Sequence, residues 1–221
     1  MRTVIKLEHV SKKFSEEQVL KDVCFEFQEG KIYGIVGNNG SGKTVLMKCI
    51  CGFLNPSSGK ILVNYKEIGK DVDFPEDIAV IIETPGFLPN LTGMKNLEIL
   101  ASLQHKIGKE RIQEVLQTVG LDPKLKKTVS KYSLGMRQRL GIAQAVMEDP
   151  SILILDEPFN GLDKKGVKQM HELILSLKGE RKTILLSSHS QNDIDVLCDT
   201  VCEMDAGTMT CIRERAGERD G

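Results

Sequence analysis

Alternation and runs of apolar residues divide the chain into predicted strands. Residues 4–10 alternate between apolar and polar positions, which predicts a strand with one face in water. Residues 24–27 and 59–65 also favour strands, and these three segments could form an antiparallel sheet. Four other runs are continuously apolar, as expected of strands buried in a parallel sheet, namely residues 31–36, 78–82, 152–155 and 183–186.

Helical periodicity appears between these strands. Residues 45–50 follow the strand at 31–36 and favour the start of a helix. Apolar residues three and four positions apart predict further helices around residues 97–104, 112–119, 140–147 and 167–177. Strands that alternate with helices indicate an α/β fold with a parallel sheet.

Two segments differ in composition from this predicted core. Residues 84–132 are interrupted by Pro85, Pro89 and Pro123 and rich in charge, so they predict a helical subdomain inserted between two core strands. Residues 213–221 are charged and lack apolar anchors, so we expect this C-terminal tail to be loosely ordered.

Composition narrows the class of protein. The chain has 221 residues, 40% of them hydrophobic and 28% charged, which suits a globular protein. Its net charge of −1 gives no basic field, so no nucleic-acid partner is expected. No apolar run approaches the roughly 18 residues of a membrane span. Lys6 and Glu8 stand where a signal peptide would be apolar, so we expect no export signal. The six scattered cysteines predict reduced thiols and a cytoplasmic location.

Residues 37–44 form the pattern G-x-x-x-x-G-K-T of a phosphate-binding loop, between a predicted strand and a predicted helix. Its residues are Gly37, Asn38, Asn39, Gly40, Ser41, Gly42, Lys43 and Thr44. Glycines let successive N–H groups face one anion, and the helix N-terminus adds partial positive charge. Lys43 can reach the outer phosphates and Thr44 can ligate Mg²⁺. The loop predicts binding of a nucleoside triphosphate.

The apolar strand at 152–155 runs directly into Asp156 and Glu157. Such a strand delivers both carboxylates to the C-terminal edge of the sheet, where the phosphate loop also lies. Asp156 is placed to hold Mg²⁺ through water, and Glu157 to polarise a water that attacks the γ-phosphorus. The alternative is a solvated pair of carboxylates at a strand end.

Residues 132–140 read Tyr-Ser-Leu-Gly-Met-Arg-Gln-Arg-Leu and open a helix for which Ser133 is a suitable N-cap. This segment resembles the signature motif of ATP-binding cassette (ABC) ATPases, whose common form is Leu-Ser-Gly-Gly-Gln. Ser133 and Gly135 match that form, whereas Leu134 and Met136 replace a Gly and the Gln.

Other positions agree with this family in order, from about residue 3 to about residue 207. Phe14 stands where the family has an aromatic that stacks on adenine, and residues 159–163 resemble its D-loop, which ends at Asp163. His189 resembles the switch histidine that senses the γ-phosphate. A core or surface role for Phe14 and an ordinary polar role for His189 are the alternatives.

The resemblance implies a fold and a site. The fold is a single ABC ATPase domain over residues 1–221, with a P-loop NTPase core (a RecA-like parallel sheet), an antiparallel β subdomain and the inserted helical subdomain. Two such domains would close head to tail. Each ATP would lie between the phosphate loop of one and Ser133 and Gly135 of the other, with Asp163 nearby. Lys43, Glu157 and His189 would be catalytic. The second cassette is either another copy or a relative.

One position departs from the usual family pattern. After the strand at 78–82 the family has a Gln that reaches Mg²⁺, and this chain has Glu83. A carboxylate can ligate the metal together with Thr44 and Asp156, but it adds negative charge beside a triphosphate. A neutral replacement without consequence is the alternative.

Glu83 and the altered signature resemble one branch of the family, the ATPase subunits of bacitracin-resistance and lantibiotic-immunity exporters. Residues 89–93 and 96–97 also resemble that branch. In such proteins the residues after Glu83 contact the membrane subunit. Phe87 and Leu88 are therefore candidate docking residues, unless both pack inside the insert.

The resemblance implies an ATP-hydrolysing subunit that powers export of an antimicrobial peptide or similar compound. It would be cytoplasmic, peripheral on the inner face of the cell membrane, and bound to an integral membrane permease. Alternatives are an ABC transporter of other cargo and a soluble ABC ATPase acting on ribosomes or DNA. An enzyme that phosphorylates a small molecule would have no use for the signature segment.

Overall fold

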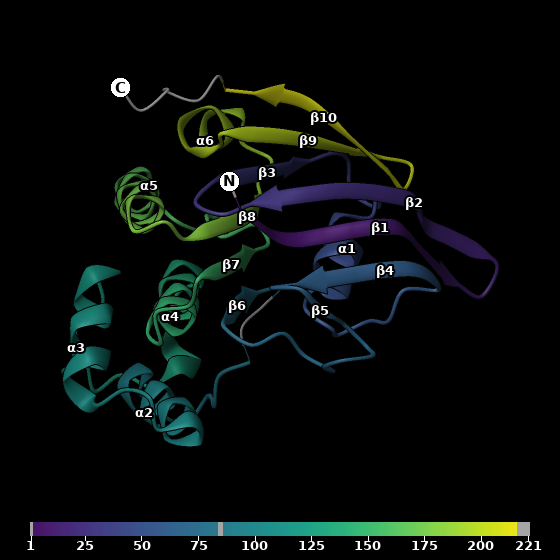
Figure 1. Cartoon of the computed structure of the whole chain (residues 1–221). Coiled ribbons are helices and arrows are strands. Elements are labelled where there is room, and N and C mark those ends of the chain that lie inside the picture. The colour runs from purple at the N-terminus through teal and green to yellow at the C-terminus, as the bar shows by residue number, and fades with distance from the viewer. Residues whose placement is uncertain (1, 84–85, 216–221) are drawn as a thin grey trace.

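The computed structural model describes residues 2–83 and 86–215 of the protein. A six-stranded, mostly parallel sheet lies at the centre, with a four-stranded antiparallel sheet on one side and helices α2 to α6 beyond its other side (Figure 1). The predicted α/β fold is confirmed.

The central sheet gathers strands from the whole chain. Its order is β10 (Thr208–Glu214), β9 (Thr200–Asp205), β3 (Ile32–Val36), β8 (Thr183–Ser187), β7 (Ile152–Leu155) and β6 (Ile78–Ile81). All neighbours pair in parallel except β10, which runs antiparallel to β9. The four buried apolar runs form β3, β6, β7 and β8, as predicted, whereas β9 and β10 were not anticipated.

Side chains of the central strands alternate between two hydrophobic cores. On β7, Ile152 and Ile154 enter the core beside the antiparallel sheet. Leu153 and Leu155 enter the core beside the helices. Burial on both faces explains why this strand is apolar at every position.

The antiparallel sheet has the order β2 (Glu17–Gln28), β1 (Thr3–Phe14), β4 (Ser58–Val63) and β5 (Lys66–Glu67). It contains the three segments predicted for it. Helix α1 (Lys43–Ile50) contributes Leu46, Met47 and Ile50 to the core that this sheet shares with the central one. The start of α1, which carries the phosphate loop, is thereby fixed to both sheets.

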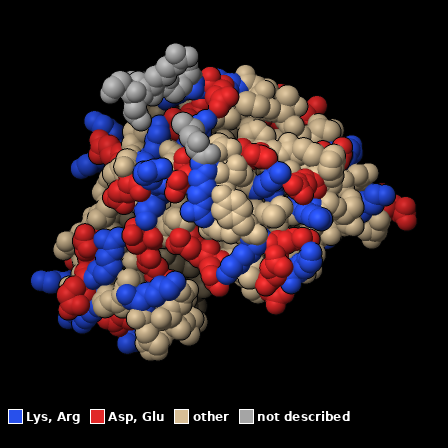
Figure 2. Space-filling model, viewed as in Figure 1, with Lys and Arg blue, Asp and Glu red and all other residues tan. Residues whose placement is uncertain are grey.

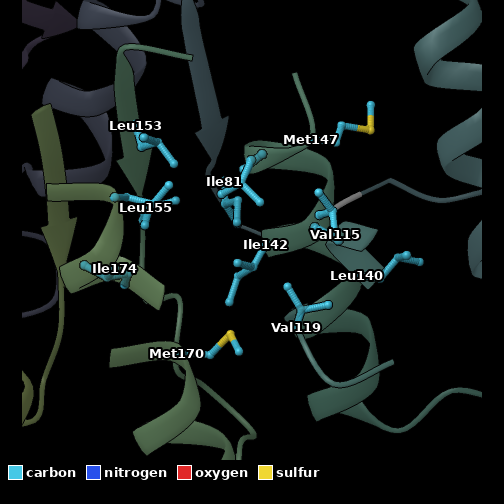
Figure 3. Close-up of a cluster of buried hydrophobic side chains, with 14 of the residues drawn as sticks. Ile81, Val115, Val119, Leu140, Ile142, Met147, Leu153, Leu155, Met170 and Ile174 are labelled. Carbon is cyan, nitrogen blue, oxygen red and sulfur yellow. The ribbon is translucent and has the colours of Figure 1, made fainter. Parts of the chain in front are cut away.

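The other core joins the helices to the sheet. These elements are α2 (Gly93–Gln104), α3 (Lys109–Thr118), the 3₁₀ helix η1 (Val129–Lys131), α4 (Leu134–Val146), α5 (Lys164–Gly179) and α6 (Gln191–Leu197). Figure 3 shows Val115 of α3, and Val119 just after this helix, facing Ile142 of α4, with Ile81 and Leu155 on the strand side. Helix α4 therefore lies between α3 of the predicted insert and the central sheet.

The insert predicted at 84–132 contains α2, α3 and η1, and Thr84 and Pro85 lie outside the described residues. Helix α2 begins where the Thr92 hydroxyl accepts a hydrogen bond from Lys95 N at 3.2 Å. This cap satisfies one of the free N–H groups of the first turn.

The C-terminal segment is more ordered at its start than expected. Arg213 and Glu214 belong to β10 and pair with Val201 and Thr200 of β9. The Arg213 guanidinium also contacts the Asp195 carboxylate and donates to the Ile194 carbonyl at 3.0 Å. These long-range contacts anchor residues that composition alone assigned to the tail, and residues 216–221 lie outside the described part.

The surface carries both signs of charge. Basic and acidic side chains are interspersed over the face in view (Figure 2). Within residues 2–83 and 86–215, no helix combines the length and apolar character needed to cross a membrane.

Candidate functional site

The phosphate loop connects β3 to α1 and needs glycine at defined positions. Gly37 has φ +143°, and a Cβ there would lie 2.2 Å from the carbonyl oxygen of Met204. Gly42 is the N-cap of α1 with φ +107°, a conformation that other residues rarely adopt. The loop can therefore bring its backbone N–H groups and the start of α1 around one anion.

Polar groups inside the loop are arranged for a charged ligand. Lys43 is buried, and its Nζ donates to the carbonyls of Gly37 at 2.7 Å and Asn38 at 3.1 Å. The buried Ser41 hydroxyl oxygen has no hydrogen-bond partner among the described residues. Because buried polar groups are nearly always paired, this hydroxyl and the ammonium fit a bound phosphate.

Asp156 follows β7 and is held from two sides. Its Oδ2 accepts a hydrogen bond from the Thr44 hydroxyl at 2.7 Å, and its Oδ1 accepts one from the Ser187 hydroxyl at 2.6 Å. The Thr44 and Asp156 oxygens are hard ligands of the kind that Mg²⁺ prefers. The donor set and its position beside the phosphate loop fit this metal.

Ser187 was not singled out by the sequence. It is the last residue of β8 and is fully buried. While its hydroxyl donates to Asp156, its oxygen accepts a hydrogen bond from Glu157 N at 2.9 Å. One serine therefore positions both carboxyl-bearing residues of the neighbouring strand.

Glu157 directs its carboxylate toward His189. Its φ is +51°, in the left-handed region that Glu rarely adopts, and its Oε1 is buried without a hydrogen-bond partner. The His189 Nε2 lies 3.4 Å from this oxygen without forming a hydrogen bond. Backbone strain and an unpaired buried oxygen are both typical of functional positions.

These groups converge on one cavity of about 230 Å³. Its lining includes residues from the phosphate loop, the carboxylate strand and the segment after β8: Asn39, Gly40, Ser41, Gly42, Lys43, Thr44, Asp156, Glu157 and His189. The structure thus brings together five side chains, from Lys43, Thr44, Asp156, Glu157 and His189, that sequence reasoning assigned to phosphate or metal chemistry.

The signature segment lies apart from that lining. Ser133 is the N-cap of α4, and its Oγ accepts a hydrogen bond from Met136 N at 3.2 Å. A Cβ on Gly135 would lie 2.7 Å from the Gly161 carbonyl oxygen, so the signature packs directly against the D-loop. Neither Ser133 nor Gly135 is among the described residues that line the phosphate-loop cavity.

Asp163 and Gln138 tie these loops to the core. The Asp163 carboxylate caps α5 by accepting a hydrogen bond from Gly166 N at 2.9 Å. Gln138 of the signature helix donates from Nε2 to the Glu157 carbonyl at 3.4 Å. Helix α4 is therefore in direct contact with both the D-loop and the backbone of Glu157, which follows β7, within one chain.

Phe14 occupies the end of β1, at the tip of the β1–β2 hairpin. Its side chain is 42% exposed, and the Lys12 ammonium lies 5.1 Å from its ring centroid. Of the hairpin residues, Val19 lines the phosphate-loop cavity and Phe14 does not. The ring is therefore exposed at the surface, outside the cavity lining.

Glu83 makes a contact that the sequence did not reveal. Its Oε1 accepts a hydrogen bond from the Lys48 Nζ at 2.6 Å, and its side chain is 67% exposed. Lys48 lies one helical turn after Thr44 on α1. A cation is thus already paired with the carboxylate that replaces the family's usual Gln.

The two candidate docking residues differ in how exposed their side chains are. Phe87 is half-buried and packs against the core on the helix side of the sheet. Leu88 is exposed, although its backbone is held by Asn96, whose Oδ1 accepts from Leu88 N at 2.7 Å. Of the two, Leu88 therefore has the more exposed apolar side chain.

A buried polar chain supports the segment that carries His189. His171 Nε2 lies 3.0 Å from Asp193 Oδ1, and the Ser188 hydroxyl donates to Asp193 Oδ2 at 2.7 Å. The His171 ring also contacts Phe159 of the D-loop edge to face, at 5.0 Å between centroids. These residues join α5, α6 and the D-loop behind His189, and sequence reasoning did not give His171 or Asp193 a role.

Comparison with known proteins identifies this arrangement. Residues 20–160 match the family model described as ABC transporter. The chain belongs to the ABC transporter family. It is an ABC-type ATPase subunit, as the sequence predicted.

Several relatives in this family are similar over most of the chain. The uncharacterized ABC transporter ATP-binding protein YybJ of Bacillus subtilis is 39% identical over 206 residues, covering 93% of this chain and 94% of YybJ. The bacitracin transport ATP-binding protein BcrA of Enterococcus faecalis is 41% identical, covering 94% of this chain and 68% of BcrA. The lantibiotic transport ATP-binding protein SrtF of Streptococcus pyogenes is 33% identical, covering 98% of this chain and 93% of SrtF.

A solved ABC structure shares the fold. The dimeric structure of MJ0796, a bacterial ABC transporter cassette, matches with a TM-score of 0.84 over 95% of this chain and 99% of that one. The sequence identity is 23%, so the match establishes the architecture.

Proposed function

We propose that this ABC ATPase subunit powers the export of an antimicrobial peptide or a similar compound. The relatives named for bacitracin and lantibiotic transport support this cargo class. The observation that carries the ATPase part is the convergence of Lys43, Thr44, Asp156, Glu157 and His189 on one cavity.

In the proposed reaction Glu157 is the general base. Its Oε1 has no hydrogen-bond partner, which leaves it free to accept a proton from an attacking water. His189, within 3.4 Å, can sense the γ-phosphate and orient that carboxylate. Lys43 would leave the two loop carbonyls and place its charge on the outer phosphates, where it stabilises the developing negative charge.

Mg²⁺, when bound, neutralises phosphate charge, and Thr44 and Asp156 are the residues that would hold it. The Thr44 hydroxyl donates to the Asp156 carboxylate at 2.7 Å, so the two oxygens already lie next to each other. Glu83 is a third proposed ligand, and its carboxylate would have to break its ion pair with Lys48 to reach the metal.

We propose that a second cassette completes the site. Ser133 and Gly135 lie at the start of α4, outside the cavity of their own chain, where they could cover the nucleotide of a partner. The dimeric MJ0796 cassette supports such a pair by its fold. The partner is a second copy or a close relative, and Phe14, Asn38, Asn39 and Asp163 complete the ATP contacts.

The subunit is proposed to sit on the cytoplasmic side of the membrane, bound to an integral permease. The inserted subdomain at 84–132 would transmit closure to that permease, because closed and open cassettes present it differently. Leu88, exposed at the start of this subdomain, is the proposed apolar contact.

The catalytic assignment is tested with Glu157→Gln. This variant should bind ATP normally, lose turnover by about 100-fold or more because a general base is removed, and accumulate as an ATP-bound dimer in light scattering. Glu172→Gln on the exposed face of α5 is the matched control and should hydrolyse ATP normally. A Glu157→Gln variant with a near wild-type rate would refute the base assignment.

The cargo assignment is tested in cells that lack the chromosomal copy of this subunit. Wild-type protein should restore resistance to a peptide antibiotic such as bacitracin or a lantibiotic, and Glu157→Gln should not. The purified complex should contain an integral membrane protein. Isolation with ribosomes instead, or unchanged resistance across both peptide classes, would contradict the exporter proposal.

A further inference from the structure

Two irregularities in the β1–β2 pair bring three metal-binding residue types together. The register of these strands shifts on each side of the Val10–Val23 pair, with one extra residue first on β1 and then on β2. His9 and Asp22 occupy the irregular positions with φ +53° and +52°. Because β-bulges redirect side chains, His9 and Asp22 face each other next to Cys24.

The three side chains have spacings close to those of a metal centre. His9 Nδ1 lies 2.9 Å from Asp22 Oδ1 and 3.6 Å from Cys24 Sγ. A tetrahedral Zn²⁺ site places N and O ligands about 3.4 Å apart, and N and S ligands about 3.6 Å apart, from its bond lengths. All three ligand atoms lie within 4.8 Å of one another. The side chains are exposed, so small rotations can close the set without disturbing packed atoms.

We propose that His9, Asp22 and Cys24 bind a divalent transition-metal ion of the Zn²⁺ class, with water as the fourth ligand. An imidazole, a thiolate and a carboxylate form a borderline-to-soft ligand set that selects Zn²⁺ over Mg²⁺ or Ca²⁺. The His9 backbone N–H donates to Cys24 Sγ at 3.2 Å, which holds the sulfur beside the other two ligand atoms. The site is separate from the Thr44 and Asp156 oxygens.

The ion would link the middle of two strands whose far ends form the hairpin bearing Phe14. The strand ladder is interrupted on each side of the Val10–Val23 pair, so the ion would add a cross-strand link where the register shifts. A metal bound only to the folded sheet stabilises it by an amount that rises with the logarithm of the free metal concentration once that exceeds the Kd. The stability of the antiparallel sheet would then depend on the metal ion, whereas ATP hydrolysis would not require that ion.

Co²⁺ is a suitable probe because it replaces Zn²⁺ in tetrahedral sites and shows a thiolate charge-transfer band. Reduced, nucleotide-free protein should bind one Co²⁺ per chain with this band, and added Zn²⁺ should displace it. Cys24→Ser should abolish the band. Cys211→Ser is the matched control, because Cys24 and Cys211 are the two exposed cysteines, and it should keep the band.

His9→Gln and Asp22→Asn test the other ligands and should each weaken Co²⁺ binding at least tenfold. Zn²⁺ should raise the melting temperature of the wild type and of Cys211→Ser but not of Cys24→Ser. Circular dichroism without metal confirms that the variants fold. A wild-type protein without the band, a band that survives Cys24→Ser, or unchanged affinity in both His9→Gln and Asp22→Asn would overturn the proposal.

Discussion

Replacement of Ser187 by alanine should weaken both the fold and the chemistry of the site. The Ser187 hydroxyl is the common partner of Asp156 Oδ1 at 2.6 Å and Glu157 N at 2.9 Å. Alanine removes both hydrogen bonds and fits the same space. The Asp156 carboxylate then keeps only its Thr44 partner, and the Glu157 N–H loses the hydrogen bond that holds its strained backbone.

The magnitude follows from the two lost contacts. A hydrogen bond to a charged group contributes about 1.5–3 kcal/mol, and an unsatisfied buried N–H costs about 1–3 kcal/mol. The two effects share one site and are not fully additive, so we expect a loss of roughly 3 kcal/mol in the free energy of unfolding. For a chain of this length that corresponds to a fall of about 6 °C in melting temperature. Turnover should fall about tenfold or more, because Glu157 is no longer held in position.

Calorimetry and steady-state ATP hydrolysis over a range of Mg²⁺ concentrations separate the two effects. Thr183→Val is the matched control, because Thr183 lies at the opposite end of β8 and its buried Oγ1 accepts a hydrogen bond from Gly30 N at 3.1 Å. It should lower stability but leave turnover and Mg²⁺ dependence unchanged. A Ser187→Ala protein with wild-type melting and turnover would refute the argument. Reduced stability with normal turnover would limit Ser187 to a structural role.

Three further predictions concern Glu83, the signature and the buried thiols. Lys48→Met should change stability by less than about 1 kcal/mol, because the Glu83 side chain of this ion pair is 67% exposed. The variant should lower the Mg²⁺ concentration needed for hydrolysis, because Glu83 no longer has to leave Lys48 to reach the metal; adding Glu83→Gln should cancel this gain, and a gain that survives would argue against Glu83 as a ligand. Gly135→Ala should leave ATP binding intact but reduce ATP-dependent dimerisation and turnover, because the added Cβ would lie 2.7 Å from the Gly161 carbonyl oxygen. Gly179→Ala is the control, because a Cβ there would meet open space. Urea unfolding should show falling stability as pH rises from about 9 toward 12, because unfolded thiols ionise first, and a flat profile would contradict this. Burial raises the pKa to about 12 for Cys51, Cys198 and Cys202.

Local sequence patterns were sufficient to predict most of the fold. The apolar runs that became β3, β7 and β8 are buried on both faces, so their composition reports their environment directly, whereas β6 at the sheet edge is only partly buried. Strands β9 and β10 and helix α6 were missed. Helix α6 has only seven residues, and β10 alternates weakly because most of its side chains are exposed.

Contacts between distant residues could not be predicted. The phosphate loop and the carboxylate strand carry local signatures, but Ser187 acts through an approach of β8 to β7 that no spacing encodes. The same holds for Lys48 and Glu83, which are 35 positions apart. Phe87 and Leu88 are adjacent and equally apolar, yet one is packed and one exposed.

The tight approach of Gly135 to Gly161 has a thermodynamic consequence for the proposed pair of cassettes. The signature would touch the nucleotide of the partner, whereas the D-loop continues from the strand that carries its own chain's Glu157. Any shift of Gly135 that strengthens contact with one nucleotide must then alter the geometry at the other. Such coupling is reciprocal, so ATP binding at either site changes the ATP affinity of the other site by the same factor. A mixed dimer with one inactivated site should therefore show altered ATP affinity in the intact site.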